Sequence, residues 1–203
     1  MTARKKVDIE AKQDSKRRKI LQAYYELVAE DGLENCSMAK IAKKIGIPSS
    51  LIFHYFTNKQ EMTYSLVDYV LELCEGKDTI TSDYPVDERG LRQFLEFMIK
   101  PGSGDNTEDI MFFACKTMAF RDDVVREKFR QHDNRIIDSC SDVIKQYIEA
   151  GIVANINAPD AGLMICAAET AVKDMADDYR GEDQFKRFLE YQITSTYDFL
   201  TKK

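Results

Sequence analysis

Two short apolar segments joined by a glycine turn constrain this chain more than any other feature. They cover residues 38–45 and 49–56, with Gly46 between them. Ser37 precedes the first segment, where serine is a favoured helix N-cap. Pro48 precedes the second, at a place where a first helical position tolerates the missing N–H. Because a glycine between short helical segments is typical of a tight turn, two crossed helices are expected here.

Helical periodicity also extends on both sides of this pair. Apolar residues recur at three and four residue spacing from Ser15 until Gly32, which is expected to end that helix. Asn58 is the expected N-cap of a helix over 59–75. Five more helices are expected at 87–100, 108–120, 122–150, 158–179 and 182–201. With only 9 Gly and 4 Pro and no alternating strand pattern, the chain is predicted to be all-α.

The chain is expected to divide near residue 75. Residues 1–14 are polar and predicted to form a mobile basic N-terminal arm, 15–75 a helical head, and 76–203 a helical body. Residues 1–65 carry a net charge of +4 and the remainder −10, within a total of −6. A basic head on an acidic body suits contact with nucleic-acid phosphate. The alternative interpretation is a solvated basic tail that binds no partner.

Several classes of protein are disfavoured. No apolar run approaches 18 residues and the charged start lacks a signal peptide, so a cytoplasmic protein without a membrane partner is expected. The five cysteines are at least 25 residues apart, without CxxC, and are read as buried thiols with no metal site. The two histidines lack the Glu-x-x-His spacing of a helical-bundle enzyme, and no other catalytic motif or cofactor signature occurs. The chain is therefore not expected to be an enzyme.

The paired segments match a helix-turn-helix, in which the second helix enters the major groove of DNA. The apolar underside that would anchor it to the preceding helix is predicted to consist of Ile41, Ile45, Ile47, Ile52, Phe53 and Phe56. The side left facing outward is predicted to consist of Ser49, Ser50, Leu51, His54 and Tyr55.

The stretch from Ser15 to Glu75 resembles the DNA-binding head of TetR-family regulators. The shared elements are Gly32, Ser37, Ile41-Ala42, Gly46-Ile47, the cluster Ile52-Phe53-His54-Tyr55-Phe56, and Asn58-Lys59-Gln60-Glu61. The resemblance implies a three-helix DNA-binding head followed by a helical-bundle domain for dimerisation and ligand binding. It implies a regulator, commonly a repressor, that binds a pseudo-palindromic operator as a homodimer and is released by a small apolar or aromatic molecule. A ligand-independent DNA-binding protein remains the alternative.

The resemblance also assigns roles to residues of the head. Tyr55 and Lys59 match positions that clasp phosphates, and Ser37 would be both N-cap and phosphate donor. Residues 49–56 contain no Lys or Arg, so this helix cannot read guanine through a basic side chain. Base readout would instead depend on hydrogen bonds from serine and histidine, on apolar contacts with thymine methyl groups, and on DNA shape. A solvated His54 or Lys59, or an inward Tyr55, is the alternative. The full predicted DNA-binding set is Arg17, Arg18, Lys19, Ser37, Met38, Pro48, Ser49, Ser50, Leu51, His54, Tyr55 and Lys59.

Two further sets are predicted in the body. By the same resemblance, the last two helices of each subunit form a four-helix dimer interface, with a monomeric core as the alternative; its residues are Ala161, Met164, Ile165, Ala168, Val172, Phe185, Phe188, Leu189 and Ile193. A Met- and Phe-rich region suits an adaptable ligand pocket, with ordinary core as the alternative. The pocket set is Met98, Met111, Phe112, Cys115, Phe120, His132, Cys140 and Tyr147.

Overall fold

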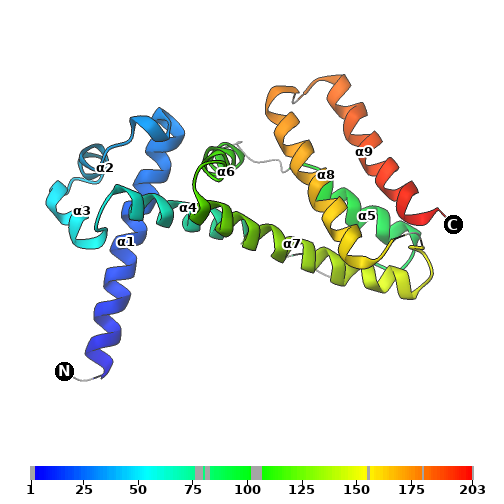
Figure 1. Ribbon diagram of the computed structural model, residues 1–203, viewed down its shortest axis with the longest axis horizontal. Coiled ribbons are helices and arrows are strands. Elements are labelled where there is room, and N and C mark those ends of the chain that lie inside the picture. Colours follow the sequence, from blue (N-terminus) through cyan, green and yellow to red (C-terminus); the bar gives the residue numbers. More distant parts are fainter. Residues whose placement is uncertain are drawn as a thin grey trace. The chain divides into compact units, whose positions relative to one another are not determined.

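The computed structural model describes residues 3–75, 80, 83–101, 107–154, 156–179 and 181–202 (Figure 1). Within these ranges every regular element is a helix, so the predicted all-α fold is confirmed. In chain order the elements are α1 (Ala3–Asp31), the 3-10 helix η1 (Leu33–Asn35), α2 (Met38–Lys44), α3 (Ser49–Tyr55), α4 (Lys59–Glu75), α5 (Glu88–Ile99), α6 (Thr107–Met118), α7 (Asp123–Glu149), α8 (Ala158–Tyr179) and α9 (Asp183–Thr201). Most of the turn-rich joint expected after Glu75 lies outside the described residues.

The helices form two compact units, each with its own apolar core. The first unit comprises Met1–Lys77 and Thr107–Phe129, and the second comprises Asp78–Asn106 and Arg130–Lys203. The sequence predicted one boundary near residue 75. The structure instead groups α6 and the start of α7 with the head, so the first unit is discontinuous in sequence.

The first helix is longer than expected. α1 begins at Ala3 rather than Ser15, so the segment predicted to be a mobile arm continues the helix. Residues 3–14 contain no glycine or proline and are rich in Ala, Glu, Gln, Lys and Arg, which have high helix propensity. The helix ends at Asp31, and Gly32 follows with a φ of 81°, in the left-handed region that glycine adopts without strain.

Local signals fix the helix-turn-helix. Gly46 has a φ of 69°, and the amide of Ile47 donates to the Ala42 carbonyl at 3.0 Å, which closes the end of α2. Pro48 has extended backbone and is the N-cap of α3, one residue before the first helical position expected for it. Its fixed φ suits this role equally, because an N-cap amide also lacks an intrahelical partner.

The first core joins α1, α2, α3 and α4 to α6 and the start of α7. Tyr24 of α1 is fully buried, and its hydroxyl is hydrogen-bonded to Thr63 Oγ1 of α4 at 3.1 Å. Met111 and Cys115 of α6 are also fully enclosed. These apolar side chains explain why α6 belongs to the head.

A polar contact also ties α4 to the start of α7 within this unit. The Tyr64 hydroxyl of α4 donates to Asp122 Oδ2 at 2.8 Å. Asp122 Oδ1 accepts the amides of Val124 and Val125, and so caps α7. The Asp122 carboxylate therefore caps the N-terminus of α7 and also binds α4 through Tyr64.

In the second unit, α5, α8 and α9 pack on one another around a core that includes side chains of α7. Two glycines allow close backbone approach. A Cβ on Gly162 of α8 would lie 2.5 Å from the Ile137 carbonyl oxygen of α7, and a Cβ on Gly90 of α5 would lie 1.8 Å from the Pro85 carbonyl oxygen. Tyr147 donates its hydroxyl to that same Pro85 oxygen at 3.1 Å.

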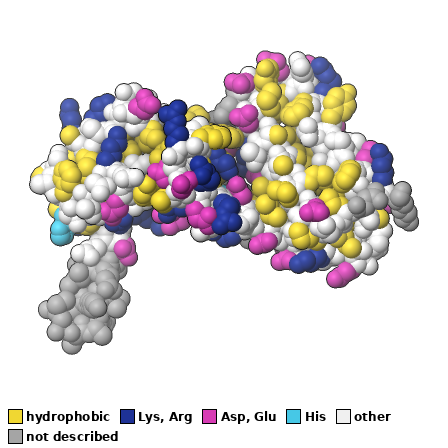
Figure 2. All heavy atoms as spheres, in the orientation of Figure 1, with side chains coloured by type: hydrophobic (Ala, Val, Ile, Leu, Met, Phe, Trp, Pro, Cys, Tyr) yellow, Lys and Arg dark blue, Asp and Glu magenta, His cyan; other side chains and the backbone are white. Residues whose placement is uncertain are grey.

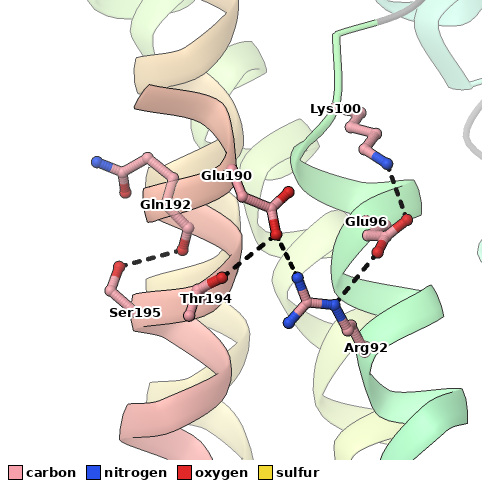
Figure 3. A network of polar contacts seen from close by, with 7 residues as sticks. All are labelled: Arg92, Glu96, Lys100, Glu190, Gln192, Thr194 and Ser195. Carbon is pink, nitrogen blue, oxygen red and sulfur yellow. Dashed lines mark hydrogen bonds and ion pairs between the residues drawn. The ribbon is translucent and has the colours of Figure 1, made fainter. Parts of the chain in front are cut away.

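An ion-pair network joins α5 to α9 on the surface of this unit (Figure 3). Arg92 pairs with Glu190 of α9 and, at 3.4 Å, with Glu96 on its own helix. Lys100 contacts the other oxygen of Glu96 at 2.8 Å, and this hydrogen bond with the lysine is the main reason the pKa of Glu96 lies below its ordinary value. Because these groups are partly exposed, the network orients the two helices more than it stabilises them.

All five cysteines are free thiols; four of them are buried as predicted, whereas Cys74 is half-buried. Burial raises the pKa of Cys115 to about 12, so this thiol is uncharged and packs as a small apolar residue.

Candidate nucleic-acid interface

α3 presents an apolar side to the core and a polar side to solvent. Ile52 and Phe56 are fully buried, whereas Ser49, Ser50 and His54 are exposed. The three polar residues therefore lie on the outward side that the sequence predicted. They form a short hydrogen-bonding surface that no other element of the head covers.

Phe53 corrects the predicted underside of α3. Its side chain is 56% exposed, so it faces solvent rather than the core. The reason is helical geometry, since Phe53 follows Ser49 by four residues and shares its face. The four-residue spacing places Phe53 on the exposed face, whereas its aromatic character alone favours an inward orientation. Phe53 is thus a candidate contact residue that the sequence analysis missed.

Leu51 and Tyr55 are half-buried on the side of α3 that faces α1. The Tyr55 ring makes an edge-on contact with the His54 ring, with centroids 5.2 Å apart. Part of each side chain remains open along a groove that also includes Lys19 of α1. Tyr55 therefore points neither fully inward nor fully outward.

The N-terminus of α2 is capped as predicted. Ser37 Oγ accepts a hydrogen bond from the Lys40 amide at 3.2 Å, and Ser37 itself is exposed. Met38 is half-buried against the first core. The cap role of Ser37 is confirmed, and its role as a phosphate donor stays a prediction.

The start of α4 is held by reciprocal capping. Asn58 Oδ1 accepts the Glu61 amide at 2.9 Å, and Glu61 Oε2 accepts the Thr57 amide at 2.7 Å. The hydrogen bond from the Thr57 backbone, with a smaller contribution from Arg17, lowers the pKa of Glu61. Lys59 is exposed in the first turn, next to a positive helix end that favours phosphate.

Arg17, one of the predicted DNA contacts, is bound by groups of the head itself. Its guanidinium donates to the Tyr55 carbonyl at 2.7 Å and to Ser65 Oγ at 2.8 Å, and pairs with Glu61 at 3.3 Å. It also lies 4.2 Å from the centre of the Phe56 ring. Arg17 thus braces the end of α3 and the start of α4 against α1.

The two cations after Arg17 face different sides of α1. Arg18 pairs with Glu72 of α4 at 3.5 Å and lies over the Tyr69 ring, so it turns toward α4. Lys19 is exposed along the groove that contains Leu51. Of the three predicted basic contacts on α1, Lys19 alone stands near α3 without an ion pair among the described residues.

The buried residues of the predicted ligand pocket divide between the cores of the two units. Met111, Phe112 and Cys115 pack in or against the first core, whereas Met98, Cys140 and Tyr147 are buried in the second. His132 is buried and Phe120 is 82% exposed. Phe120 is thus more exposed than an enclosed pocket position would be, and the pocket itself stays a prediction. The set divides because helical spacing identifies the apolar side of a helix but not the core that this side enters.

The predicted dimer set also divides by burial. Five of its members are buried in the chain's own second core: Ala161, Ile165, Val172, Phe185 and Ile193. The half-buried members are Met164, Ala168, Phe188 and Leu189. The buried five are unavailable to a partner, which corrects their assignment. Figure 2 shows hydrophobic side chains on the visible surface of the second unit, over α8 and α9.

Two kinds of feature are absent from the described residues. Those residues contain no group of three or more His, Cys, Asp or Glu side chains arranged to hold a metal ion. No described helix is both long and apolar enough to cross a bilayer.

The geometry of α2, the Gly46 turn and α3 is that of a helix-turn-helix DNA-binding domain. Residues 20–63 match the family model of the bacterial regulatory proteins of the tetR family. An HTH-type transcriptional regulator of Staphylococcus aureus is 30% identical over 88 residues, which are 41% of this chain and 48% of that protein. The chain therefore spans about half the length of the curated relatives it matches. The N-terminal domain is therefore similar to the DNA-binding domain of tetR-family transcriptional regulators.

Solved structures show the same fold over nearly the whole chain. A TetR transcription regulator from Haloarcula marismortui has a TM-score of 0.72 at 18% identity, covering 92% of this chain and 97% of its own. A protein from Saccharomonospora viridis solved in complex with choline has a TM-score of 0.71 at 16% identity, covering 94% of this chain and 97% of its own. At these identities the likeness concerns the fold.

Proposed function

We propose that this chain binds a pseudo-palindromic DNA operator as a homodimer and represses transcription there. The observation that carries the proposal is the exposed side of α3, where Ser49, Ser50, Phe53 and His54 are free of the core. A short helix with a polar outer face, anchored by a buried inner face, fits the major groove of a duplex. The TetR-family head supports DNA as the partner.

Phosphate contacts would come from groups that surround α3. Lys59 and the amides of the first turn of α4 lie at one end of the helix, and Ser37 lies at the start of α2. Tyr55 and Lys19 lie along the side that faces α1. Contacts of this kind set the register of the protein on DNA and are insensitive to base sequence.

Base readout would depend on small polar and apolar groups. Serine and histidine donate to or accept from base edges, whereas Phe53, Leu51 and Pro48 suit the methyl group of thymine. The absence of Lys and Arg from α3 removes the strongest guanine contact. We therefore expect half-sites in which thymine and adenine dominate the positions facing α3.

A dimer would give the protein a second reading helix, because one short helix reads too few base pairs for a specific site. We place the interface on the outward stripe of α8, defined as Leu163, Ala167, Ala171 and Met175. All four side chains are exposed, and they recur every four residues along one face. Tyr191 of α9 is a further exposed apolar side chain, at 69%. In TetR-family regulators the last two helices of each subunit form the dimer interface, and the resemblance to this family supports the choice.

Release by a small apolar or aromatic molecule is part of the proposal, and the choline complex of one structural neighbour shows that a protein with this fold accepts a small ligand. A ligand-independent DNA-binding protein is the second candidate. It is favoured by the burial of the predicted pocket residues in two separate cores.

Selection of genomic fragments by the purified full chain, followed by sequencing, tests the proposal. We expect enrichment of a two-fold symmetric motif, bound with strong salt dependence. The double variant Ser50→Ala/His54→Ala should lose motif preference. Ser139→Ala, at an exposed position of α7, is the matched control and should select the same motif. The proposal fails if the unmodified chain ignores duplex DNA at modest ionic strength.

A further inference from the structure

A groove of about 540 Å³ opens in the first unit, between α1, the end of α2 and α3. Its volume lies within the range of roughly 300–1,000 Å³ that is usual for small-molecule sites. The residues around it come from the head alone and include none of those predicted for a ligand pocket in the body. The groove is therefore a separate candidate site.

The floor of the groove is apolar. Ile20 and Ala23 of α1 are buried beneath it, and Ile45, Ile47 and Leu51 are half-buried along its walls. Apolar surface left open in a hollow gains free energy when a ligand's apolar body covers it. The floor therefore favours a hydrocarbon chain or ring.

Charge differs between the two ends of the groove. At one end Lys44 is neutralised by Glu26 at 3.4 Å and Glu30 at 2.8 Å. At the other end Lys16 and Lys19 are exposed, and no side chain in the described part of the chain forms an ion pair with either. One end is thus balanced and the other is cationic.

We infer that this groove binds an amphipathic carboxylate, with its anionic group at Lys16 and Lys19 and its apolar body on the floor. A DNA phosphate would also reach the two lysines, but a phosphate has no apolar part to cover Ile47 and Leu51. A molecule with both parts satisfies the whole site. A medium-chain fatty acid has this chemistry.

The position of the groove implies competition with DNA, a consequence that rests on the proposed function. Leu51 and Tyr55 line the groove and also belong to the proposed DNA-contacting set. A molecule seated against them would occupy space that the duplex needs. The ligand and DNA therefore exclude each other on the same head, without any change transmitted from the body.

Calorimetric titration of the full chain with dodecanoate, below its micelle concentration and without DNA, tests the site directly. We expect saturable binding of one molecule per chain. Dodecyltrimethylammonium, which has the same tail and the opposite charge, should bind at least about fivefold more weakly, as loss of a surface ion pair implies. Equal binding of the two amphiphiles would overturn the inference.

Variants locate the site on the head. Lys16→Glu should weaken dodecanoate binding by about fivefold or more, for the same electrostatic reason. Lys43→Glu changes an exposed lysine of α2 outside the groove and should leave the affinity unchanged. If both variants lose affinity equally, the carboxylate is not held at this site and the inference is wrong.

Competition is measured by titrating the selected operator duplex at several dodecanoate concentrations. The half-saturating protein concentration should rise in proportion to dodecanoate without reaching a plateau, whereas a plateau would contradict mutual exclusion. If the chain binds dodecanoate as expected but no duplex, the proposed function fails and the groove assignment stands. If the chain binds duplex DNA but dodecanoate does not bind in the calorimetric titration, the groove assignment fails and the proposed function stands.

Discussion

Among single residues, Arg17 shows how a charge that the sequence assigns to DNA is used inside the protein. Its planar guanidinium donates to two oxygens on different segments and stacks on a ring, which an ammonium cannot reproduce. The position of α3 relative to α1 therefore depends on this side chain.

We expect Arg17→Lys to lower the free energy of unfolding by about 1 kcal/mol, since several hydrogen bonds to a charged group are lost but the group is partly exposed. Urea denaturation measures this change. Arg18→Lys, whose pair with Glu72 is 64% and 58% exposed, is the control and should change stability by less than about 0.5 kcal/mol. Equal effects of the two variants would show that the brace does not stabilise the head.

Gly90 is constrained by space rather than by its backbone angles. A methyl group there would overlap the Pro85 carbonyl, which also accepts the Tyr147 hydrogen bond. We expect Gly90→Ala to cost about 1–3 kcal/mol, the usual range for overpacking, and to lower Tm. Gly181→Ala provides the comparison, since φ is 93° there but nothing lies within 4 Å. Its cost should be smaller, about 1 kcal/mol; the reverse order would contradict the steric argument.

Among the elements, α4 has a pH-sensitive start. The pKa of Glu61 is lower in the folded head than in the unfolded chain, so its contribution to stability is present above its ordinary pKa of about 4.3 and is lost as the pH falls through the folded value. We expect the stability difference between the unmodified chain and Glu61→Gln to shrink as the pH is lowered from 5 toward 3. Denaturant unfolding across this interval measures it, and a constant difference would contradict the capping role.

The α3 helix and the start of α4 should differ in what they contribute to DNA binding. Lys59→Ala should weaken binding to all duplexes and reduce the slope of log affinity against log salt by about 1, as loss of one phosphate contact implies. His54→Ala should instead change the ranking of operators and leave the slope nearly unchanged. Fluorescence anisotropy over a salt series separates the two. A changed slope for His54→Ala would indicate a phosphate contact.

At the scale of the whole molecule, pairing through the outward stripe of α8 is open to direct test. Leu163→Arg/Ala171→Arg should yield a monomer, because two copies of the stripe would bring like charges together in a desolvated contact. Sedimentation velocity measures the mass, and circular dichroism checks that the helices remain. Ser139→Arg adds a charge at an exposed position of α7 and should leave the dimer intact. An unchanged dimer in the double variant would remove the stripe from the interface.

Local signals explain how much of this fold could be predicted. The ends of α2, α3 and α4 follow from a serine cap, a glycine turn and an asparagine cap, all of which act within a few residues. Orientation was harder to predict. Phe53 and Phe120 are apolar yet exposed, and α8 has apolar residues on both sides, so its pattern does not identify the side that enters the core. Membership of α6 in the head depends on contacts distant in sequence.

The discontinuity of the first unit has a practical consequence for cutting this protein into parts. A fragment that stops near residue 77 would lack Met111, Cys115 and Phe129, which complete its apolar interior. The inner surfaces of α1 and α4 would then meet water, and such a fragment would tend to aggregate or unfold. An isolated head would need α6 and the start of α7 joined back on, for instance by a short linker that replaces the intervening residues.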